Sequence, residues 1–300
     1  KRMKILLFGK NGQVGWELQR SLAPLGELIA LGSSESGSLS GNFATPESIA
    51  QTVRAVRPQI IVNAAAYTAI DKAESEANLA QALNATAPGV LARVAHECNA
   101  WLVHYSTDYV FDGSGTDPWR EESQTGPISV YGRTKLEGEE AIRASGCRHL
   151  ILRTSWVYAA RGGNFAKTML RLAMERDRLT VIDDQFGAPT GAELLADTTA
   201  HALRTALQRP EVAGTYHAVA AGETNWHEYA RHVIESARRR KQRIKVAPEA
   251  IAPVPSAAFP TPARRPANSR MDSTKLQRTF ELTLPDWRIG VDRMLAEILN

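Results

Sequence analysis

The sequence predicts an α/β fold in which a doubly wound parallel sheet is joined to a smaller C-terminal lobe. Three observations support this class. Short apolar runs without polar alternation recur along the chain, and such runs are typical of parallel strands buried on both faces. Stretches with a helical pattern separate the runs, as expected for right-handed β–α–β crossovers. The first run also leads through a glycine loop into a helical pattern, which is the arrangement of a Rossmann-type fold.

Strands and helices are expected to alternate through the first half of the chain. The predicted buried strands are residues 5–8, 28–31, 60–63, 101–106 and 150–155. The predicted helices are residues 16–22, 46–56, 74–98 and 131–144. A further strand is predicted much later, at residues 215–219, so the chain is expected to leave the sheet near Trp156 and return to it. We therefore predict a Rossmann domain in residues 1–155, completed by the later strand, and a mainly separate lobe in residues 156–300.

The composition is that of an ordinary globular protein. The chain has 300 residues, of which 43% are hydrophobic and 23% charged, with a net charge of +4. No apolar run approaches the ~20 residues that span a bilayer, and the start lacks the apolar segment and cleavage site of a signal peptide. Cys98 and Cys147 suggest neither a disulfide framework nor a metal cluster. We therefore expect a cytoplasmic protein without membrane association.

Two patterns in the second half of the chain have simple structural explanations. The densest basic run, Arg238 to Lys241, lies where a helical pattern ends, and cations there interact favourably with the helix dipole. Because no aromatic residues interleave with this run, we expect no nucleic-acid binding. His227 and His232 imitate the H-E-x-x-H pattern of zinc proteases, but they stand five residues apart. Their side chains would point to different faces of a helix, so we expect no metal there.

The glycine loop predicts a dinucleotide site. Three glycines follow the first strand with the spacing G-x-x-G-x-x-G, and a helical pattern follows them. Glycines let the backbone approach a pyrophosphate, and the helix N-terminus presents free N–H groups and a positive dipole end to it. An ordinary glycine-rich turn is the structural alternative. The loop residues expected to hold the cofactor are Gly9, Gly12, Gln13, Val14 and Gly15.

Three further residues have the chemistry for reducing a carbonyl group. Tyr131 and Lys135 stand four residues apart in a helical pattern, so they share one face of the helix. A nearby cation stabilises a tyrosinate and shifts the pKa of the tyrosine toward neutrality, which suits a proton donor. The same lysine can reach the ribose of a nicotinamide. Thr107, at the end of the fourth predicted strand, is placed to hydrogen-bond the substrate oxygen.

The end of the second strand bears on the choice of cofactor. A carboxylate there would hydrogen-bond the adenosine ribose and favour NAD. This chain instead has Gly32, Ser33 and Ser34, with Lys10 expected nearby. The sequence therefore favours NADPH.

The chain resembles the dTDP-4-dehydrorhamnose reductases, which are extended short-chain dehydrogenases/reductases, along essentially its whole length. That family reduces the 4-keto group of dTDP-4-dehydro-β-L-rhamnose to dTDP-β-L-rhamnose with NADPH or NADH, the last step in making this precursor of cell-surface polysaccharides. Besides the glycine loop, the resemblance lies in residues 63–68, 106–113, 131–135, 153–158, 184–190 and 265–269, of which Ser106 to Phe111 is the most specific.

The resemblance also implies roles for individual residues. Small side chains at the end of the third strand would admit the nicotinamide riboside, and other residues would contact adenine, sugar nucleotide or diphosphate. Family members can form a homodimer with magnesium held between subunits by glutamates. The implied cofactor contacts are Ala64, Ala65 and Ala66, with Asn42 and Phe43 on the adenine side. The implied substrate contacts are Thr68, Thr107, Asp108, Tyr109, Tyr131, Trp156 and Arg265. The implied metal ligands are Glu17, Glu193 and Glu297.

Two alternative functions use the same framework. A sugar-nucleotide 4,6-dehydratase or epimerase shares the hydride machinery, but a dehydratase usually carries Asp-Glu directly after the active-site threonine. Here Asp108 and Tyr109 follow Thr107, which favours a simple reductase. Relatives have also become non-catalytic, cofactor-binding regulatory subunits. Such a subunit would be free to lose Tyr131 and Lys135, and this chain has both.

Overall fold

The protein is built around a six-stranded sheet in which every neighbouring pair is parallel. The structure is a computed structural model, and it describes residues 2–34 and 38–299. The strand order is β10-β5-β4-β3-β1-β2, and all five pairs are parallel. The order reverses between β1 and β3, which is the switch point where α/β folds bind ligands. The strands are β1 (Lys4–Phe8), β2 (Glu27–Leu31), β3 (Ile60–Asn63), β4 (Trp101–Thr107), β5 (Arg148–Thr154) and β10 (Gly214–His217). The six predicted strands are thus confirmed, with small differences at their ends.

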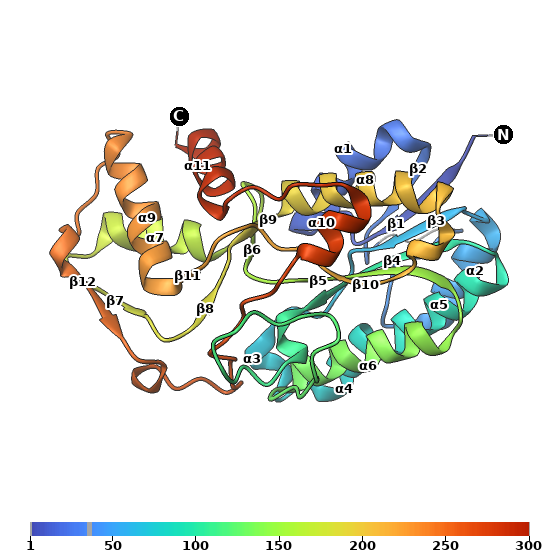
Figure 1. The fold of residues 1–300 in the computed structure, drawn as a ribbon, viewed down its shortest axis with the longest axis horizontal. Coiled ribbons are helices and arrows are strands. Elements are labelled where there is room, and N and C mark those ends of the chain that lie inside the picture. The colour runs from blue at the N-terminus through green and yellow to red at the C-terminus, as the bar shows by residue number, and fades with distance from the viewer. Residues whose placement is uncertain (1, 35–37, 300) are drawn as a thin grey trace.

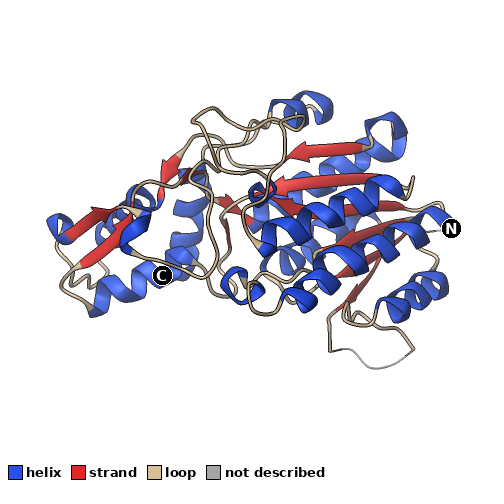
Figure 2. Cartoon of the chain, turned by 90° about the horizontal axis from the view of Figure 1, so that it is seen from below, coloured by secondary structure: helices blue, strands red, loops and turns tan. Residues whose placement is uncertain are grey.

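Helices cover both faces of this sheet (Figures 1 and 2). On one face, α1 (Gln13–Leu22), α8 (Ala192–Gln208) and α10 (Thr274–Phe280) bury leucines such as Leu18 and Leu203 against Leu7 of β1 and its neighbours. On the other face lie α2 (Pro46–Val56), α5 (Ala87–Glu97) and α6 (Val130–Ala144). The predicted helices at residues 16–22, 46–56 and 131–144 are confirmed. More of the second half than β10 packs on this sheet, because α8 and α10 also belong to its core.

The helix predicted at residues 74–98 is confirmed for most of its length, because helical residues run without a gap from Ala77 to Glu97, but it includes a π-helical turn. The segment from Ile70 contains α3 (Ile70–Ala73), α4 (Ala77–Gln81), a π-helical turn (Ala82–Thr86) and then α5. Pro88 has no N–H to donate to the carbonyl of Asn84 four residues earlier, which breaks the α-helical bonding there. The buried Asn84 side chain instead bonds the backbone of Tyr67 in both directions, at 2.9 and 3.1 Å. The irregular turn thereby anchors the loop after β3.

The smaller lobe lies at the carboxyl end of the sheet (Figure 1). Its apolar core includes Tyr229, Val233, Trp287 and Leu295. The proline-rich stretch at residues 252–266 begins within a short strand. The elements of this lobe are α7 (Phe165–Glu175), α9 (Trp226–Arg239), α11 (Trp287–Ile298), and the strand pairs β7 (Leu179–Ile182) with β12 (Ile251–Val254), β8 (Phe186–Gly187) with β11 (Thr224–Asn225), and β6 (Val157–Tyr158) with β9 (Thr190–Gly191).

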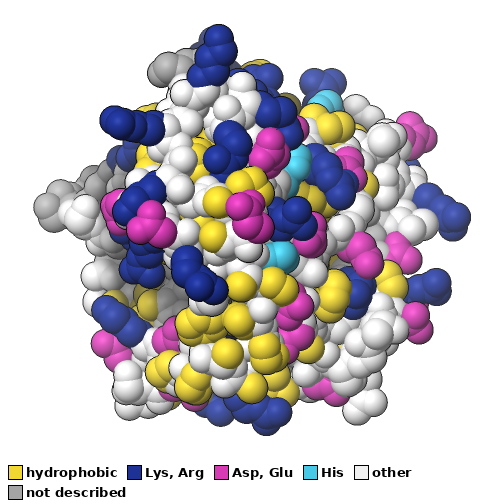
Figure 3. All heavy atoms as spheres, turned by 90° about the vertical axis from the view of Figure 1, so that its left-hand side faces the viewer, with side chains coloured by type: hydrophobic (Ala, Val, Ile, Leu, Met, Phe, Trp, Pro, Cys, Tyr) yellow, Lys and Arg dark blue, Asp and Glu magenta, His cyan; other side chains and the backbone are white. Residues whose placement is uncertain are grey.

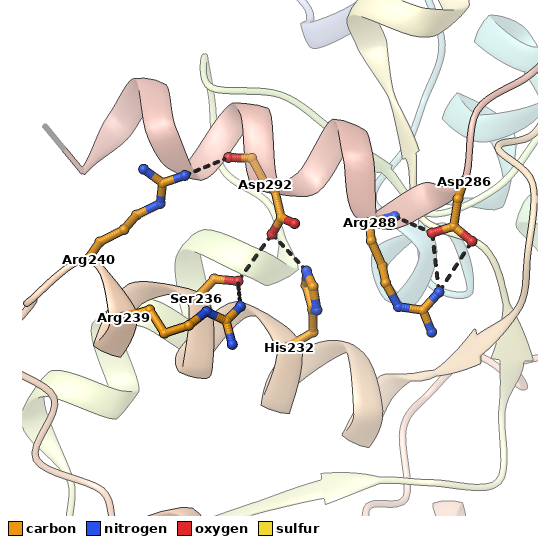
Figure 4. A network of polar contacts seen from close by, with 7 residues as sticks. All are labelled: His232, Ser236, Arg239, Arg240, Asp286, Arg288 and Asp292. Carbon is orange, nitrogen blue, oxygen red and sulfur yellow. Dashed lines mark hydrogen bonds and ion pairs between the residues drawn. The ribbon is translucent and has the colours of Figure 1, made fainter.

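Polar contacts join α9 to α11 within this lobe (Figure 4). Asp292 accepts a hydrogen bond from Ser236 Oγ at 3.1 Å and lies 2.8 Å from His232 Nε2. His227 has a different partner, the Ile251 carbonyl, so the two histidines do not converge. On the face of the molecule formed by the smaller lobe, Lys and Arg side chains are intermingled with Asp and Glu side chains (Figure 3).

None of the described helices combines the length and the apolar character needed to cross a membrane.

Candidate active site

A cavity of about 710 Å³ opens at the carboxyl edge of the sheet, between the Rossmann domain and the smaller lobe. Side chains from the ends of β3, β4 and β5, from the first turns of α1 and α6, and from α7, β7 and α9 form its walls. The cavity thus brings together most of the predicted site. The predicted residues that line it are Gln13, Val14, Ala64, Ala66, Thr68, Thr107, Asp108, Tyr109, Tyr131, Lys135, Trp156 and Arg265.

The glycine loop fits a dinucleotide pyrophosphate. Gly9 has φ +82°, and a Cβ there would lie 2.6 Å from the Ala64 carbonyl carbon. A Cβ on Gly15 would overlap the Gly9 carbonyl oxygen, so Gly15 lets α1 pack against the loop. A Cβ on Gly12 would meet only the Gly9 oxygen, at 3.6 Å, which leaves the space before α1 open. Gly12 caps α1 without a side-chain hydrogen bond, so the first N–H groups of this helix are available to an anion.

Besides the three glycines of the loop, three predicted cofactor contacts lie outside the cavity lining: Asn42, Phe43 and Ala65. Phe43 is only 3% exposed and packs edge-on against Phe8, with ring centroids 5.4 Å apart. Asn42 Oδ1 accepts a hydrogen bond from the Ala44 N–H at 3.0 Å, and Ala65 packs against the core on the α2–α5–α6 face. The Phe43 ring is therefore a core side chain, and any contact of Phe43 with adenine would have to use its backbone.

The turn after β2 is small and close to the glycine loop. Gly32 is buried, and a Cβ on it would meet the Asn11 amide nitrogen at 2.7 Å and the Lys10 Cε at 3.8 Å. Lys10 therefore lies beside Gly32, as the sequence predicts. Ser33 and Ser34 follow Gly32 as exposed residues.

Thr107, Tyr131 and Lys135 converge on the same cavity. Ser129 caps α6 by accepting a hydrogen bond from the Gly132 N–H at 3.1 Å, which places Tyr131 in the first helical turn. A side chain at position 132 would overlap the Tyr109 carbonyl oxygen, so glycine lets α6 approach the end of β4. Lys135 is 3% exposed, and its Nζ donates to the Tyr105 carbonyl at 2.5 Å.

The pKa of Tyr131 differs from the expectation drawn from the sequence. Burial, followed by the nearby Asp108 carboxylate, raises the pKa of Tyr131 to about 12. Burial also lowers the pKa of Lys135 to about 8. The predicted lowering of the tyrosine pKa is therefore absent from this structure, because Tyr131 is buried and faces a carboxylate, while the Lys135 ammonium is directed at a backbone carbonyl.

Asp108 is the buried carboxylate of the site. It is 2% exposed, and burial raises its pKa to about 6. Its Oδ1 accepts a hydrogen bond from Thr107 Oγ1 at 3.1 Å, and its Oδ2 accepts one from Ser269 Oγ. The Thr107 hydroxyl also accepts from the Tyr109 N–H at 3.1 Å. The sequence places Ser269 in the smaller lobe and gives no sign of its contact with Asp108.

A buried charge pair supports the helix that carries Lys135. Arg153 of β5 donates to both carboxylate oxygens of Glu139, at 2.8 and 2.7 Å. Their side chains are 3% and 0% exposed. Glu139 lies one turn after Lys135, and its negative charge favours the protonated form of the lysine. Sequence analysis missed this pair, because no local spacing links residues 139 and 153.

Arg265 has a carboxylate partner at the cavity. Its guanidinium makes two hydrogen bonds to Asp71 of α3, both at 2.9 Å. It also donates to Thr261 Oγ1 at 2.7 Å. The predicted contact of Arg265 with a diphosphate would therefore form beside a carboxylate that already neutralises part of its charge.

The smaller lobe adds an apolar wall that the sequence did not reveal. Trp156 stacks on Trp226, with ring centroids 3.7 Å apart. Trp156 has φ +50°, and Gly187 lies beneath its ring, where a Cβ would come within 3.0 Å. The wall is built from separate elements and has no motif of its own. Its other apolar members include Phe165, Met169, Val181 and Phe259.

The three predicted metal ligands lie near a second cavity, of about 410 Å³, which Glu193 and Glu297 line. Glu193 pairs with Arg293 at 3.4 Å and Glu17 with Arg20 at 3.2 Å. Within residues 2–34 and 38–299, no group of three or more His, Cys, Asp or Glu side chains could hold a metal ion. The described part of one chain thus forms no magnesium site, and a site shared between two chains stays a prediction.

Comparisons with known proteins agree over the full length of the chain. The family model described as the RmlD substrate binding domain matches residues 3–300. The chain is 61% identical to the dTDP-4-dehydrorhamnose reductase of Shigella flexneri over 298 residues, which cover 99% of each protein. The structure of a dTDP-4-dehydrorhamnose reductase from Clostridium acetobutylicum matches with a TM-score of 0.88 at 31% identity. The Bacillus anthracis reductase, solved in complex with NADP, matches with a TM-score of 0.87 at 31% identity. Each structural match covers 99% of this chain and 100% of the other.

Proposed function

Because this chain belongs to the family of dTDP-4-dehydrorhamnose reductases, we propose that it reduces the 4-keto group of dTDP-4-dehydro-β-L-rhamnose. The product is dTDP-β-L-rhamnose, a precursor of cell-surface polysaccharides. The hydride donor is NADPH, and the reaction takes place in the cytoplasm.

The observation that carries this proposal is the shared cavity. Thr107, Tyr131 and Lys135 line the same cavity of about 710 Å³ as Gln13 and Val14, which lie between the second and third glycines of the glycine loop. A ketone bound between these two groups of residues would have a hydride donor on one side and hydroxyl groups on the other. This arrangement is what a carbonyl reduction needs.

The residues of the chain fit a nicotinamide dinucleotide. The N-terminus of α1 and the open space before Gly12 suit the pyrophosphate. Ala64 and Ala66, at the switch point of the sheet, leave room for the nicotinamide riboside. When bound, the cofactor supplies a hydride to carbon 4 of the sugar. Lys10 beside Gly32, where no carboxylate stands, favours the 2′-phosphate of NADPH.

The proton comes from the opposite side of the ketone. Tyr131 donates its phenolic proton to the developing alkoxide. Thr107 stabilises negative charge on the same oxygen once its hydroxyl proton, which Asp108 accepts in this structure, turns to the substrate. Lys135 orients the ribose and provides the positive charge that favours tyrosinate after the transfer. Since the pKa of Tyr131 is raised to about 12, the tyrosine holds its proton at neutral pH and gives it up only as the alkoxide forms.

We extend the proposal to a homodimer with bridging magnesium at Glu17, Glu193 and Glu297. Support comes from the position of Glu193 and Glu297 on the second cavity, near the ion pair of Glu17 with Arg20. Light scattering with and without a chelator tests this part. A monomer in both conditions would contradict it.

A turnover assay tests the proposed activity. The protein is incubated with NADPH and a panel of 4-keto sugar nucleotides that differ in base and sugar, and the cofactor absorbance is followed. The expected result is rapid oxidation with dTDP-4-dehydro-β-L-rhamnose and slower oxidation with the others. Tight cofactor binding without turnover of any substrate would point to a regulatory subunit instead.

A further inference from the structure

Ser269 lies behind the active site and touches its buried carboxylate. Its side chain is 3% exposed, and its hydroxyl donates to Asp108 Oδ2. The other oxygen of the same carboxylate accepts the Thr107 hydroxyl at 3.1 Å. A continuous chain of hydrogen bonds therefore runs from Ser269 through Asp108 to Thr107, which lines the cavity.

The backbone around Ser269 is fixed to both halves of the molecule. The Ser269 N–H donates to the Phe186 carbonyl of β8 at 2.7 Å. The Asn268 N–H donates to the Gly113 carbonyl at 3.0 Å, and its amide side chain donates to the Asp117 carbonyl at 2.9 Å. These bonds fix the position of Ser269 relative to the end of β4, where its hydroxyl donates to the Asp108 carboxylate.

Asp108 depends on neutral hydroxyl groups for its orientation. Among the described residues, its side-chain hydrogen bonds come from Ser269 and Thr107. The titratable groups that face it are Tyr109 and Tyr131, and the Asp108 charge raises the pKa of both. Removing either hydroxyl would leave one oxygen of a buried carboxylate without its donor, which is costly.

We propose that Ser269 is a positioning residue for ketone reduction: it holds the Asp108 carboxylate in the orientation that accepts the Thr107 hydroxyl and thereby fixes the Thr107 oxygen at the wall of the cavity. This inference rests on the proposed function. Ser269 does not line the cavity itself, so it acts through Asp108. The ionised carboxylate is the form that accepts both hydroxyl protons, so protonating Asp108 disrupts the chain of hydrogen bonds.

Ser269→Ala tests the inference, with Ser269→Thr as the variant that keeps the hydroxyl. The kcat of Ser269→Ala should fall about tenfold, because the variant loses a hydrogen bond to a charged group and such bonds are stronger than neutral ones. The KM for NADPH should not change. The Ser269 hydrogen bond lowers the pKa of Asp108. Without this hydrogen bond the pKa of Asp108 should rise. The acid limb of the kcat profile, where activity falls as the pH is lowered, should therefore move to higher pH. Ser269→Thr should restore both the rate and the limb.

Ser236→Ala is the matched control. Ser236 also donates to a carboxylate, Asp292, but in the contact between α9 and α11 (Figure 4). This variant should change neither kcat nor the pH profile. Thermal unfolding and NADPH titration of every variant show whether it is folded. A fall in stability without any movement of the acid limb would overturn the positioning role.

A readout without turnover separates this inference from the proposed function. Infrared difference spectra between acid and neutral pH follow carboxyl protonation, and the band missing in Asp108→Asn belongs to Asp108. The midpoint of that band should lie higher in Ser269→Ala than in the wild type. An unchanged midpoint refutes the inference even in an active enzyme, whereas a shifted midpoint in an inactive protein refutes only the reductase assignment.

Discussion

Replacing Arg265 with alanine should weaken binding of the sugar nucleotide far more than binding of NADPH. The guanidinium faces the cavity and already makes two hydrogen bonds to Asp71. We expect it to bind a phosphate oxygen of the substrate while keeping Asp71 as its partner, because a guanidinium has donors enough for both. In Arg265→Ala, the diphosphate would lose this contact and face the unpaired Asp71 carboxylate.

The magnitude follows from the exposure of the two side chains. Truncating one partner of a buried charge pair costs about 2–5 kcal/mol. Here the side chains of Arg265 and Asp71 are 25% and 41% exposed, so solvent screens part of the interaction. We expect a loss of roughly 1.5–3 kcal/mol, which corresponds to an increase in substrate KM of about 10- to 150-fold. The added variant Asp71→Asn should recover part of that loss by removing the repulsive charge.

Separate steady-state titrations of NADPH and sugar nucleotide provide the measurement. Arg265→Ala should keep the NADPH KM within about twofold of the wild type, since binding effects at independent sites are separable. Equal damage to both titrations would show that Arg265 supports folding rather than recognition. Unchanged values for both would move the phosphate contact elsewhere, with Arg264 and Arg270 as the next candidates.

Three further substitutions test other parts of the account. Lys135→Met should lower kcat about 10²-fold and also weaken NADPH binding in a fluorescence titration; the loss of only one of these properties would remove one of the two roles of the lysine. Gly32→Asp should shift the ratio of kcat/KM from NADPH toward NADH, because the new carboxylate repels a 2′-phosphate and only the flexible end of Asn11 must move; an unchanged ratio would place discrimination elsewhere. Arg153→Met should lower the free energy of unfolding in urea by about 3 kcal/mol, since it leaves Glu139 buried without its main partner; adding Glu139→Leu should restore most of that loss, and equal instability of both variants would contradict this explanation.

The sheet could be predicted because each strand is a short apolar run between polar segments. The run at residues 60–63 is fully buried, and a continuous apolar run is typical of a strand that is buried on both faces. The π-helical turn within the helix predicted at residues 74–98 could not be predicted in the same way. It depends on the Asn84 side chain reaching the backbone of Tyr67, a tertiary contact that no helical period reveals.

The catalytic side of the site was easier to predict than the substrate side. Tyr131 and Lys135 are four residues apart on one helix, and Thr107 ends a neighbouring strand, so local spacing and strand order place them together. Trp226 and Phe259 reach the cavity from separate elements of the smaller lobe. The Asp108–Ser269 contact joins residues 161 positions apart. Such contacts depend on how the two halves of the molecule pack.

The proton-donor role of Tyr131 is the central claim, and a single-turnover measurement on Tyr131→Phe tests it most directly. Enzyme, NADPH deuterated at the transferred position and dTDP-4-dehydro-β-L-rhamnose are mixed, and deuterium at carbon 4 of the sugar is followed by NMR. The wild type should transfer deuterium to carbon 4. Tyr131→Phe should bind NADPH normally and keep its edge-on contact with Tyr109, but transfer deuterium about 10²- to 10⁴-fold more slowly. Transfer by Tyr131→Phe at the wild-type rate would contradict the role of Tyr131 as the proton donor.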